Sequence, residues 1–316
     1  MINYINLIKE KLPLLDRILS KLNFVKKLPR SVAKSILYAI IIFDEFFWKI
    51  RIFIFTKIFF GKRSKIGKAL IDLKRTGVAI IPNFYPDKEV LKIKEECIKL
   101  LDELPFKELN TGQYITNLDL KNGLRVEKMN QEIKLKGIDK ANLFFGKIGR
   151  DLTSNILTLI YQLTFSKPFL IYNIVQDGSF KHPVFSSSVV AEADKFQTSK
   201  KIAGEIHIDH GIHHLRCCII LDNIKKENGP TVAYENSMNK IKKNHLNTML
   251  EKFKFKLDKK GEGQHLGEKE IKFLEENTNK IYITGNRGDF VMLDLKTAHY
   301  PHTLEKGQRH LLWHYY

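Results

Sequence analysis

The sequence predicts a mainly β domain with flanking helices (an α+β class), arranged as a sandwich or barrel and preceded by an N-terminal helical segment. Two observations lead to this prediction. Short apolar stretches of strand-like composition dominate residues 169–316, and few helical patterns separate them, which is typical of antiparallel sandwiches and barrels. Residues 1–68 instead have the pattern of basic, apolar helices broken near Pro13 and Pro29. We therefore expect a helical extension over residues 1–68 and one β domain over residues 69–316.

The N-terminal extension carries most of the positive charge of the chain, whose formal net charge is +18. Residues 1–68 hold 15 Lys and Arg against 4 Asp and Glu, a balance of +11, which leaves +7 for the other residues. A segment this basic favours an anionic partner, such as a phospholipid surface or a nucleic acid. No motif of interleaved aromatic and basic residues supports nucleic-acid binding, so we expect no nucleic-acid partner.

The most apolar part of the extension, residues 35–61, is a candidate for membrane contact. Five charged residues interrupt it: Asp44, Glu45, Lys49, Arg51 and Lys57. A bilayer span needs about 20 mostly apolar residues, so we predict that this stretch does not cross a membrane. Two alternatives remain for it. It is either a helix that lies in the membrane interface or a helix packed on the β domain or on a second subunit.

The cysteines indicate a reducing compartment, because Cys97, Cys217 and Cys218 are too few and too irregular for a disulfide framework. The first 20 residues mix charged and apolar side chains and do not resemble a cleavable signal peptide. We expect a cytoplasmic protein that can lie peripherally on the inner face of a membrane.

The β domain is predicted to open with a strand over Val78–Pro82 and a turn over Asn83–Pro86. An amphipathic helix follows, with Val90, Ile93 and Cys97 on its apolar side.

The rest of the domain is predicted to consist mainly of strands. Residues 106–140 are polar and are expected to be irregular, a second helix is expected over Asp151–Leu163, and a charged helical insertion is expected near residues 240–277. Seven segments are predicted to be strands: Phe169–Gln176, Gly204–Asp209, Arg216–Asp222, Thr231–Tyr234, Lys280–Thr284, Phe290–Leu295 and Arg309–Tyr316.

His207 and Asp209 form the first part of a candidate metal site. Residues two apart on a strand face the same side. This pair therefore presents an imidazole and a carboxylate together, while Ile206 and Ile208 face the other way. Alone the pair is a weak signal, because about half of one His-X-Asp pair is expected by chance in a chain of this composition.

The stretch that begins at Gly288 supplies the other parts of the site. His299 follows ten residues after Asp289, and Arg309 follows ten residues after His299. Two imidazoles and one carboxylate form the facial triad of non-haem Fe(II) oxygenases, which leaves coordination positions open for a 2-oxo acid and O₂. Arg309 offers a planar guanidinium for the distal carboxylate of that acid. His302 is the alternative third ligand, and the spacing favours His299.

The chain resembles the phytanoyl-CoA dioxygenase family of 2-oxoglutarate oxygenases over roughly residues 70–316. Four pieces in the order of that family carry the resemblance: TGVAIIPNFYPDKEV, GEIHIDH, LRCCIILDNIKKENGPTVAYENS and GDFVMLDLKTAHYPHTLEKGQRHLLWHYY. The resemblance implies a double-stranded β-helix, which is a jelly-roll, cupin-like core with flanking helices. It also implies Fe(II) held by His207, Asp209 and His299, with the cosubstrate 2-oxoglutarate anchored by Arg309. The chain departs from the family at Asn236-Ser237-Met238, where the family has a histidine.

Further pocket residues follow from the same resemblance. Tyr172 and Asn173 lie on the strand that borders the cosubstrate in this family, which makes them candidates for the cosubstrate pocket. Trp313 and Tyr315 alternate with Arg309 and are expected to line the barrel or to pack in its core.

Other polar residues near the site have simpler expected roles. Arg216 is expected to be a structural residue that forms an ion pair. His210, His213 and His214 are expected in an exposed or lid loop without a special role.

The expected reaction couples oxidative decarboxylation of 2-oxoglutarate to hydroxylation of a small organic or lipid-linked substrate, with release of succinate and CO₂. Asp209 favours hydroxylation over halogenation, because the halogenating relatives in this family replace that carboxylate to make room for a halide. The alternative is a catalytically silent jelly-roll protein that binds a membrane surface or a partner through its basic N-terminal helices.

Overall fold

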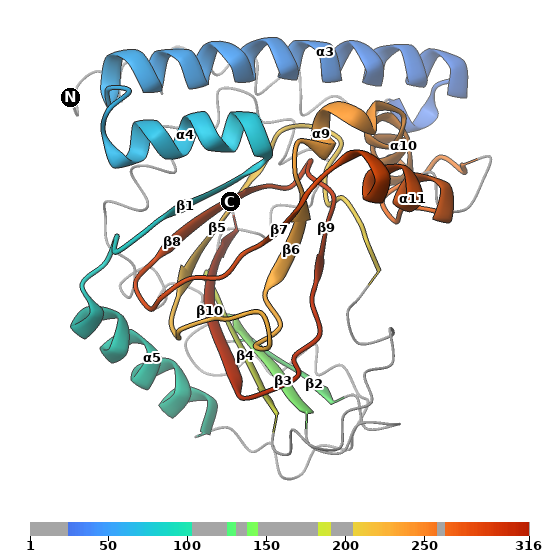
Figure 1. Cartoon of the computed structure of the whole chain (residues 1–316). Helices are drawn as coiled ribbons and strands as arrows, with labels where there is room; N and C mark the ends of the chain where they lie inside the picture. The colour runs from blue at the N-terminus through green and yellow to red at the C-terminus, as the bar shows by residue number, and fades with distance from the viewer. Residues whose placement is uncertain are drawn as a thin grey trace.

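The computed structural model describes residues 25–102, 125–130, 138–144, 183–190, 205–257 and 263–315. Within these ranges two antiparallel sheets are flanked by helices (Figure 1). This confirms the prediction of antiparallel β-structure with flanking helices. The helix expected over Asp151–Leu163 and the strand expected over Phe169–Gln176 lie outside the described residues.

The larger sheet has seven strands in the order β1-β8-β5-β10-β4-β3-β2, and every neighbouring pair is antiparallel. Its strands are β1 (Val78–Ile81), β2 (Arg125–Asn130), β3 (Ile138–Phe144), β4 (Pro183–Val190), β5 (Leu215–Ile220), β8 (Phe290–Asp294) and β10 (Gln308–Tyr315).

The smaller sheet has the order β7-β6-β9, with β6 (Thr231–Tyr234), β7 (Lys280–Tyr282) and β9 (His299–Pro301). Beyond β9, single β-bridges join His207 to His299 and to His265. This small sheet therefore ends beside two of the residues predicted to bind metal.

Side chains of the larger sheet alternate between two hydrophobic clusters, as the two-residue period of a strand requires. Three side chains of β5 point to one cluster: Leu215, Cys217 and Ile219. Cys218 and Ile220 point to a second cluster that also contains Ala233 of β6 and Ile283 just after β7. The second cluster is therefore the core between the two sheets.

Helices cover the outer face of the larger sheet. Helix α4 (Lys65–Thr76) begins where the Ser64 hydroxyl accepts the Gly67 N–H at 2.9 Å, which satisfies one of the free N–H groups of the first turn. It ends at Gly77, whose φ of 88° is in the left-handed region that favours glycine. Helix α5 (Asp87–Asp102) packs Val90 and Cys97 against the same face, as its amphipathic pattern predicts.

Helix α3 (Arg30–Ile54) runs across the top of the domain in Figure 1 and continues into a π-helical turn, η2 (Phe55–Phe59). Its residues Trp48 and Ile52 join the cluster over the larger sheet, and Leu37 and Ile41 pack against α10 (Lys242–Lys252). Of the two alternatives for residues 35–61, packing on the β domain is thus observed. No helix within the described ranges combines the length and the apolar character that crossing a membrane requires.

The boundary expected between residues 68 and 69 falls inside α4. The division into an extension and a β domain stays a prediction. The expected helical insertion contains α10 and α11 (Glu268–Asn277), preceded by the short α9 (Ser237–Lys240).

Two sequence-based expectations are wrong. Residues 205–209 contain two isolated bridges, both at His207, rather than a strand. The Ile208 N–H donates to the Gln264 carbonyl while the Asp209 N–H donates to the Leu295 carbonyl, so consecutive residues pair with different segments. Within the polar stretch 106–140, β2 and the start of β3 are strands and pair with each other at one end of the larger sheet. Edge strands tolerate polar residues, and composition alone underestimates them.

The core cluster under the helices is expected to dominate stability. Phe290 is buried there and stacks on Phe84 at 5.0 Å between ring centroids. Replacing a buried phenylalanine by alanine leaves a cavity and costs about 3–5 kcal/mol. We expect Phe290→Ala to lower the free energy of unfolding by that amount in a urea titration. Phe273→Ala on α11, where the ring is exposed, is the matched control, and an equal loss in both variants would contradict this account.

Candidate metal centre

Three of the predicted site residues converge in space. His207, Asp209 and His299 place one possible ligand atom each within 4.8 Å of the others. Nε2 of His207 lies 3.5 Å from Oδ1 of Asp209, and Nε2 of His299 lies 3.5 Å from Oδ2. The two imidazole ring centroids are 4.5 Å apart.

Backbone hydrogen bonds fix the positions of all three residues. The His207 N–H donates to the His299 carbonyl at 3.0 Å, and the His299 N–H donates back to the His207 carbonyl at 2.9 Å. Directly opposed residues of an antiparallel pair place their side chains on the same face, so the two rings must lie together. The Asp209 N–H donates to the Leu295 carbonyl at 3.0 Å, which holds the carboxylate beside them.

The second nitrogen of each imidazole is already occupied. Nδ1 of His207 lies 2.8 Å from the Glu205 carbonyl, and Nδ1 of His299 lies 2.9 Å from the Thr297 carbonyl. A carbonyl oxygen can only accept, so each Nδ1 must carry the proton. Each Nε2 then presents a lone pair toward Asp209, which is the tautomer that metal-binding histidines need.

The charges of the site are strongly coupled. Burial raises the pKa of Asp209, but the Arg216 guanidinium and the two imidazoles outweigh it and hold that pKa well below its ordinary value. Burial lowers the pKa of His299 below 6.5. Burial also acts to lower the pKa of His207, but the hydrogen bond and charge of Asp209 raise it above 6.5 overall. The site therefore combines an ionised carboxylate with two unequal imidazoles.

These residues fit a divalent transition metal. Two atoms that each lie about 2.1 Å from one ion can be no more than about 4.2 Å apart, and both nitrogen–oxygen distances of 3.5 Å satisfy that limit. Nε2 of His299 is buried and has no hydrogen-bond partner among the described residues. A buried polar atom without a partner is costly unless a ligand satisfies it.

Arg216 has a more central position than expected. It was expected to form a structural ion pair, and its partner is the candidate ligand Asp209, at 2.9 Å from Oδ2. It lies on β5 and also approaches the Trp313 ring at 5.6 Å. A carboxylate can bind a cation through one oxygen and accept from an arginine through the other, which orients it.

Arg309 lies on β10, buried, and donates to the Gly229 carbonyl. Burial lowers its pKa to about 10, so the guanidinium remains charged at neutral pH. By alternation it shares the face of Leu311 and Trp313, both of which belong to the core between the sheets.

The other candidates lie apart from the cluster. His302 packs against the rings of Tyr282 and Tyr300 and does not join His207 and Asp209. Tyr172 and Asn173 lie outside the described residues. Trp313 is buried between the sheets. Tyr315 is the last residue of β10.

The expectation that His210, His213 and His214 lie in an exposed loop is wrong. His210 and His214 are buried, with their ring centroids 4.8 Å apart. Burial lowers the pKa of His214 to about 3 and that of His210 well below 6.5, so both are neutral. Lys252 donates to Nδ1 of His210 at 3.1 Å.

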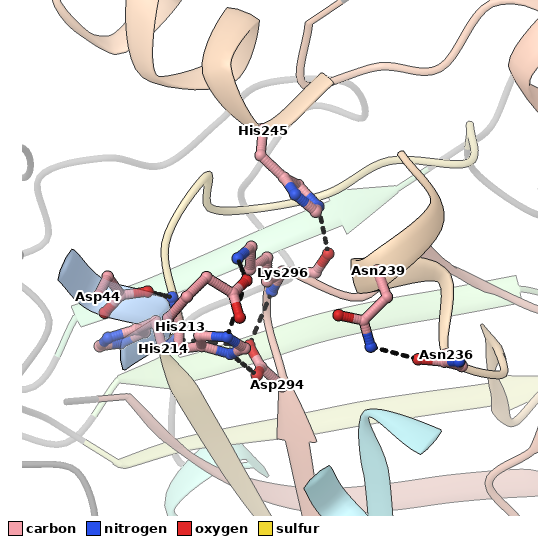
Figure 2. Close-up of polar contacts among 9 residues, drawn as sticks. Asp44, His213, His214, Asn236, Asn239, His245, Asp294 and Lys296 are labelled. Atoms are coloured by element: carbon pink, nitrogen blue, oxygen red, sulfur yellow. Dashed lines mark hydrogen bonds and ion pairs between the residues drawn. The ribbon is translucent and has the colours of Figure 1, made fainter. Parts of the chain in front are cut away.

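A polar network joins α3 to His213, Asp294 and Lys296 (Figure 2). Nδ1 of His213 contacts Oδ2 of Asp294 at 2.5 Å, and its Nε2 lies 3.3 Å from Glu45 of α3. Glu45 also pairs with Lys296, which is 1% exposed. The signal for this network in the sequence was a pair of acids in an otherwise apolar stretch. Their partners could not be found, because they lie 169 and 251 residues away.

No family model matches the sequence, and no curated protein matches it. Solved structures with a similar chain path include AviO1 from Streptomyces viridochromogenes Tue57, with 14% identity, coverage of 78% of this chain and 93% of that chain, and a TM-score of 0.46. The epimerase SnoN, in complex with Fe3+, alpha ketoglutarate and nogalamycin RO, has 11% identity over 78% and 80% of the two chains, with a TM-score of 0.45. HygX from Streptomyces hygroscopicus, with nickel, 2-oxoglutarate and hygromycin B bound, has 10% identity over 78% and 84%, with a TM-score of 0.42. Similarity this low does not place the chain in a family.

Metal binding at this site should depend on the protonation of His207. Its Nε2 must lose its proton to bind a metal, and its pKa lies above 6.5 in the metal-free protein. The affinity for Co(II) should therefore fall about tenfold per pH unit once the pH drops below that pKa. Asp209 and His299 add no further dependence near neutral pH, because their pKa values are lowered. Calorimetric titrations at pH 8, 7 and 6 measure this, and equal affinities at pH 8 and pH 6 would contradict it.

Proposed function

We propose that this chain is a non-haem Fe(II)- and 2-oxoglutarate-dependent dioxygenase that hydroxylates a small organic or lipid-linked substrate. The observation that carries the proposal is the convergence of His207, Asp209 and His299, with both Nε2 atoms aimed at the carboxylate. Two imidazoles and one carboxylate on one face are the donor set of Fe(II) oxygenases that use a 2-oxo acid.

In this proposal His207, Asp209 and His299 would hold Fe(II), and a set of three protein ligands would leave room for the cosubstrate and O₂. The bound iron and 2-oxoglutarate supply the oxidising chemistry, in which one oxygen atom enters succinate and the other enters the substrate, with loss of CO₂. The protein positions these groups. The Glu205 and Thr297 carbonyls keep the proton of each neutral imidazole on Nδ1, which leaves Nε2 for the metal, and Arg216 lies 2.9 Å from the second oxygen of Asp209.

Arg309 is the proposed anchor of 2-oxoglutarate. Its guanidinium is charged, buried and on the face of β10 that points between the sheets, and the Gly229 carbonyl holds one of its nitrogens. A planar guanidinium in a water-poor site binds a carboxylate with two parallel hydrogen bonds. Tyr172 and Asn173 are proposed as its neighbours in the cosubstrate pocket.

The proposal also includes a double-stranded β-helix fold and membership of a family. Two facing antiparallel sheets with the metal residues at the edge of the smaller one support a double-stranded β-helix. The motif resemblance supports membership of the phytanoyl-CoA dioxygenase family. Asp209 supplies a ligand carboxylate, which supports hydroxylation rather than halogenation. Contact of residues 1–68 with a membrane surface would suit a lipid-linked substrate.

Succinate release across a panel of soluble and lipid-linked metabolites tests the substrate class, and selective coupling to a soluble osmolyte would rule out a lipid-linked substrate.

The alternative of a catalytically silent protein predicts no ordered binding of metal and cosubstrate. Anaerobic addition of Fe(II) and then 2-oxoglutarate separates the two. The proposed enzyme should develop the weak visible charge-transfer band of an iron-bound 2-oxo acid. A protein that binds neither component, or binds Fe(II) without the band, would refute the oxygenase proposal.

The ligand assignment is tested by comparing His299 with its neighbour His302. We expect His299→Ala and Asp209→Ala to reduce 2-oxoglutarate-dependent succinate formation to the level of metal-free protein, because each removes a ligand from the triad. His302→Ala should retain nearly the wild-type rate, because His302 lies apart from the cluster. Normal 2-oxoglutarate consumption by Asp209→Ala would show that the ligand assignment is wrong.

Removing the proposed anchor should weaken cosubstrate binding specifically. A hydrogen-bonded charge pair contributes about 1.5–3 kcal/mol, so Arg309→Ala should raise the KM for 2-oxoglutarate about ten- to hundredfold. Arg309→Lys retains the charge but not the planar fork, and should raise the KM less. Steady-state succinate assays at saturating substrate measure both variants. An unchanged KM in Arg309→Ala would move the anchor to another residue.

A further inference from the structure

Helix α3 has two apolar faces on opposite sides. One face packs on the domain through residues such as Leu37, Ile41, Trp48 and Ile52. At 100° per residue, a second set of large apolar side chains falls on the opposite side. These side chains, which we call the outer face, are between 37% and 62% exposed: Tyr38, Ile42, Phe43, Phe46, Ile50 and Phe53.

The helix cannot rotate to bury this outer face. Asp44 accepts the His213 N–H at 2.6 Å, and Glu45 pairs with Lys296 and His213 beneath the helix. Trp48 stacks on the His213 ring with centroids 4.5 Å apart and ring planes 7° apart. Figure 2 shows Asp44 turned toward the His213 segment. Breaking a buried charge pair is strongly unfavourable, so the outer face stays directed away from the domain.

The charges around α3 are almost all positive. Between residues 25 and 71, Asp44 and Glu45 are the only acids in the sequence, and both make contacts beneath the helix. Exposed basic residues stand before, along and after the helix: Lys26, Lys27, Lys34, Lys49, Lys57, Lys62 and Arg63. Lys57 lies over the Phe53 ring, with Nζ 5.8 Å from its centroid. The outer face therefore lies in a basic region. The only two acids of residues 25–71 are engaged on the opposite side of the helix.

This combination of features indicates the partner. Contiguous exposed aromatic and aliphatic side chains on one face mark an interaction surface. A helix that cannot span a bilayer, with aromatic residues on one face and Lys and Arg around them, is suited to the boundary between lipid headgroups and acyl chains. Basic residues near an anionic leaflet add electrostatic attraction. A protein partner would need an acidic rim around an apolar groove to match the same surface.

We infer that the outer face of α3 docks on an anionic lipid bilayer, with the helix axis in the plane of the membrane and its aromatic side chains among the acyl chains. This deepens the proposed membrane contact by assigning it to one face of one helix. It does not depend on catalysis, because none of the residues involved belongs to the metal centre.

The test is co-sedimentation of the full chain with vesicles in the presence of a chelator, so that enzymatic activity has no influence on the result. Vesicles of phosphatidylcholine alone are compared with vesicles that contain phosphatidylglycerol. The wild type should bind the anionic vesicles more tightly, and added salt should weaken that binding. The triple variant Phe43→Ser, Phe46→Ser, Phe53→Ser should bind at least about tenfold more weakly, because it removes apolar area that would enter the acyl region.

Phe273→Ser is the matched control, because it removes one exposed phenylalanine from α11 and should leave vesicle binding unchanged. Equal unfolding midpoints of the triple variant and wild type verify that the fold is retained. A second triple variant, Lys26→Gln, Lys27→Gln, Lys34→Gln, should lose the preference for anionic vesicles while keeping the aromatic residues.

Two results would overturn the inference. In the first, the wild type does not bind anionic vesicles, or the aromatic triple variant binds them as well as the wild type does. In the second, the wild type is a dimer by sedimentation equilibrium, the triple variant is a monomer, and neither binds vesicles. A second copy of the chain would then be the partner that covers the outer face.

Discussion

The candidate metal centre depends on one backbone pairing, in which His207 and His299 donate to each other's carbonyl groups. This reciprocal pair places the two imidazoles on the same face. The hydrogen bond from Asp209 to the Leu295 carbonyl, four residues before His299, then fixes the carboxylate. The ligand geometry is therefore a property of sheet pairing. Side-chain contacts such as those to the Glu205 and Thr297 carbonyls refine it by selecting the tautomer.

Burial of charge is the second constraint. Asp209, Arg216, Asp294 and Lys296 all lie in or beside the core, where an isolated charge would be very unfavourable. Each has an opposite charge or a titratable partner in reach: Arg216 for Asp209, His213 for Asp294, and Glu45 for Lys296. The polar network around His213 and the candidate site are joined through Leu295, which donates to the His214 carbonyl and accepts from the Asp209 N–H.

The sequence predicted those features that depend on local pattern. Short apolar stretches of strand-like composition identified β5, β6, β8 and β10 to within two residues at each end, and the spacing of histidine, aspartate and arginine identified the three residues that converge. Features set by distant partners were not predicted. The polar strands β2 and β3 are stabilised by pairing with each other and with β4. The histidines at 210, 213 and 214 acquire their environments from α3, α10 and β8, and Arg216 acquires its environment from Asp209 and Trp313, which no local pattern indicates. His299 was favoured over His302 by spacing alone, and the structure groups His299 with the other two residues.

The ion pair between Glu45 and Lys296 also bears on how the chain can be shortened in the laboratory. Truncating the apolar N-terminus to improve solubility would delete the counter-charge of a lysine that is 1% exposed, three residues before His299. Leaving such a charge unpaired costs about 3–5 kcal/mol, a large part of the stability of an ordinary domain. The exposed apolar side chains and the counter-charge that the fold needs thus lie on different sides of the same helix. Deleting the helix removes both, whereas substitutions confined to its exposed side leave the counter-charge in place.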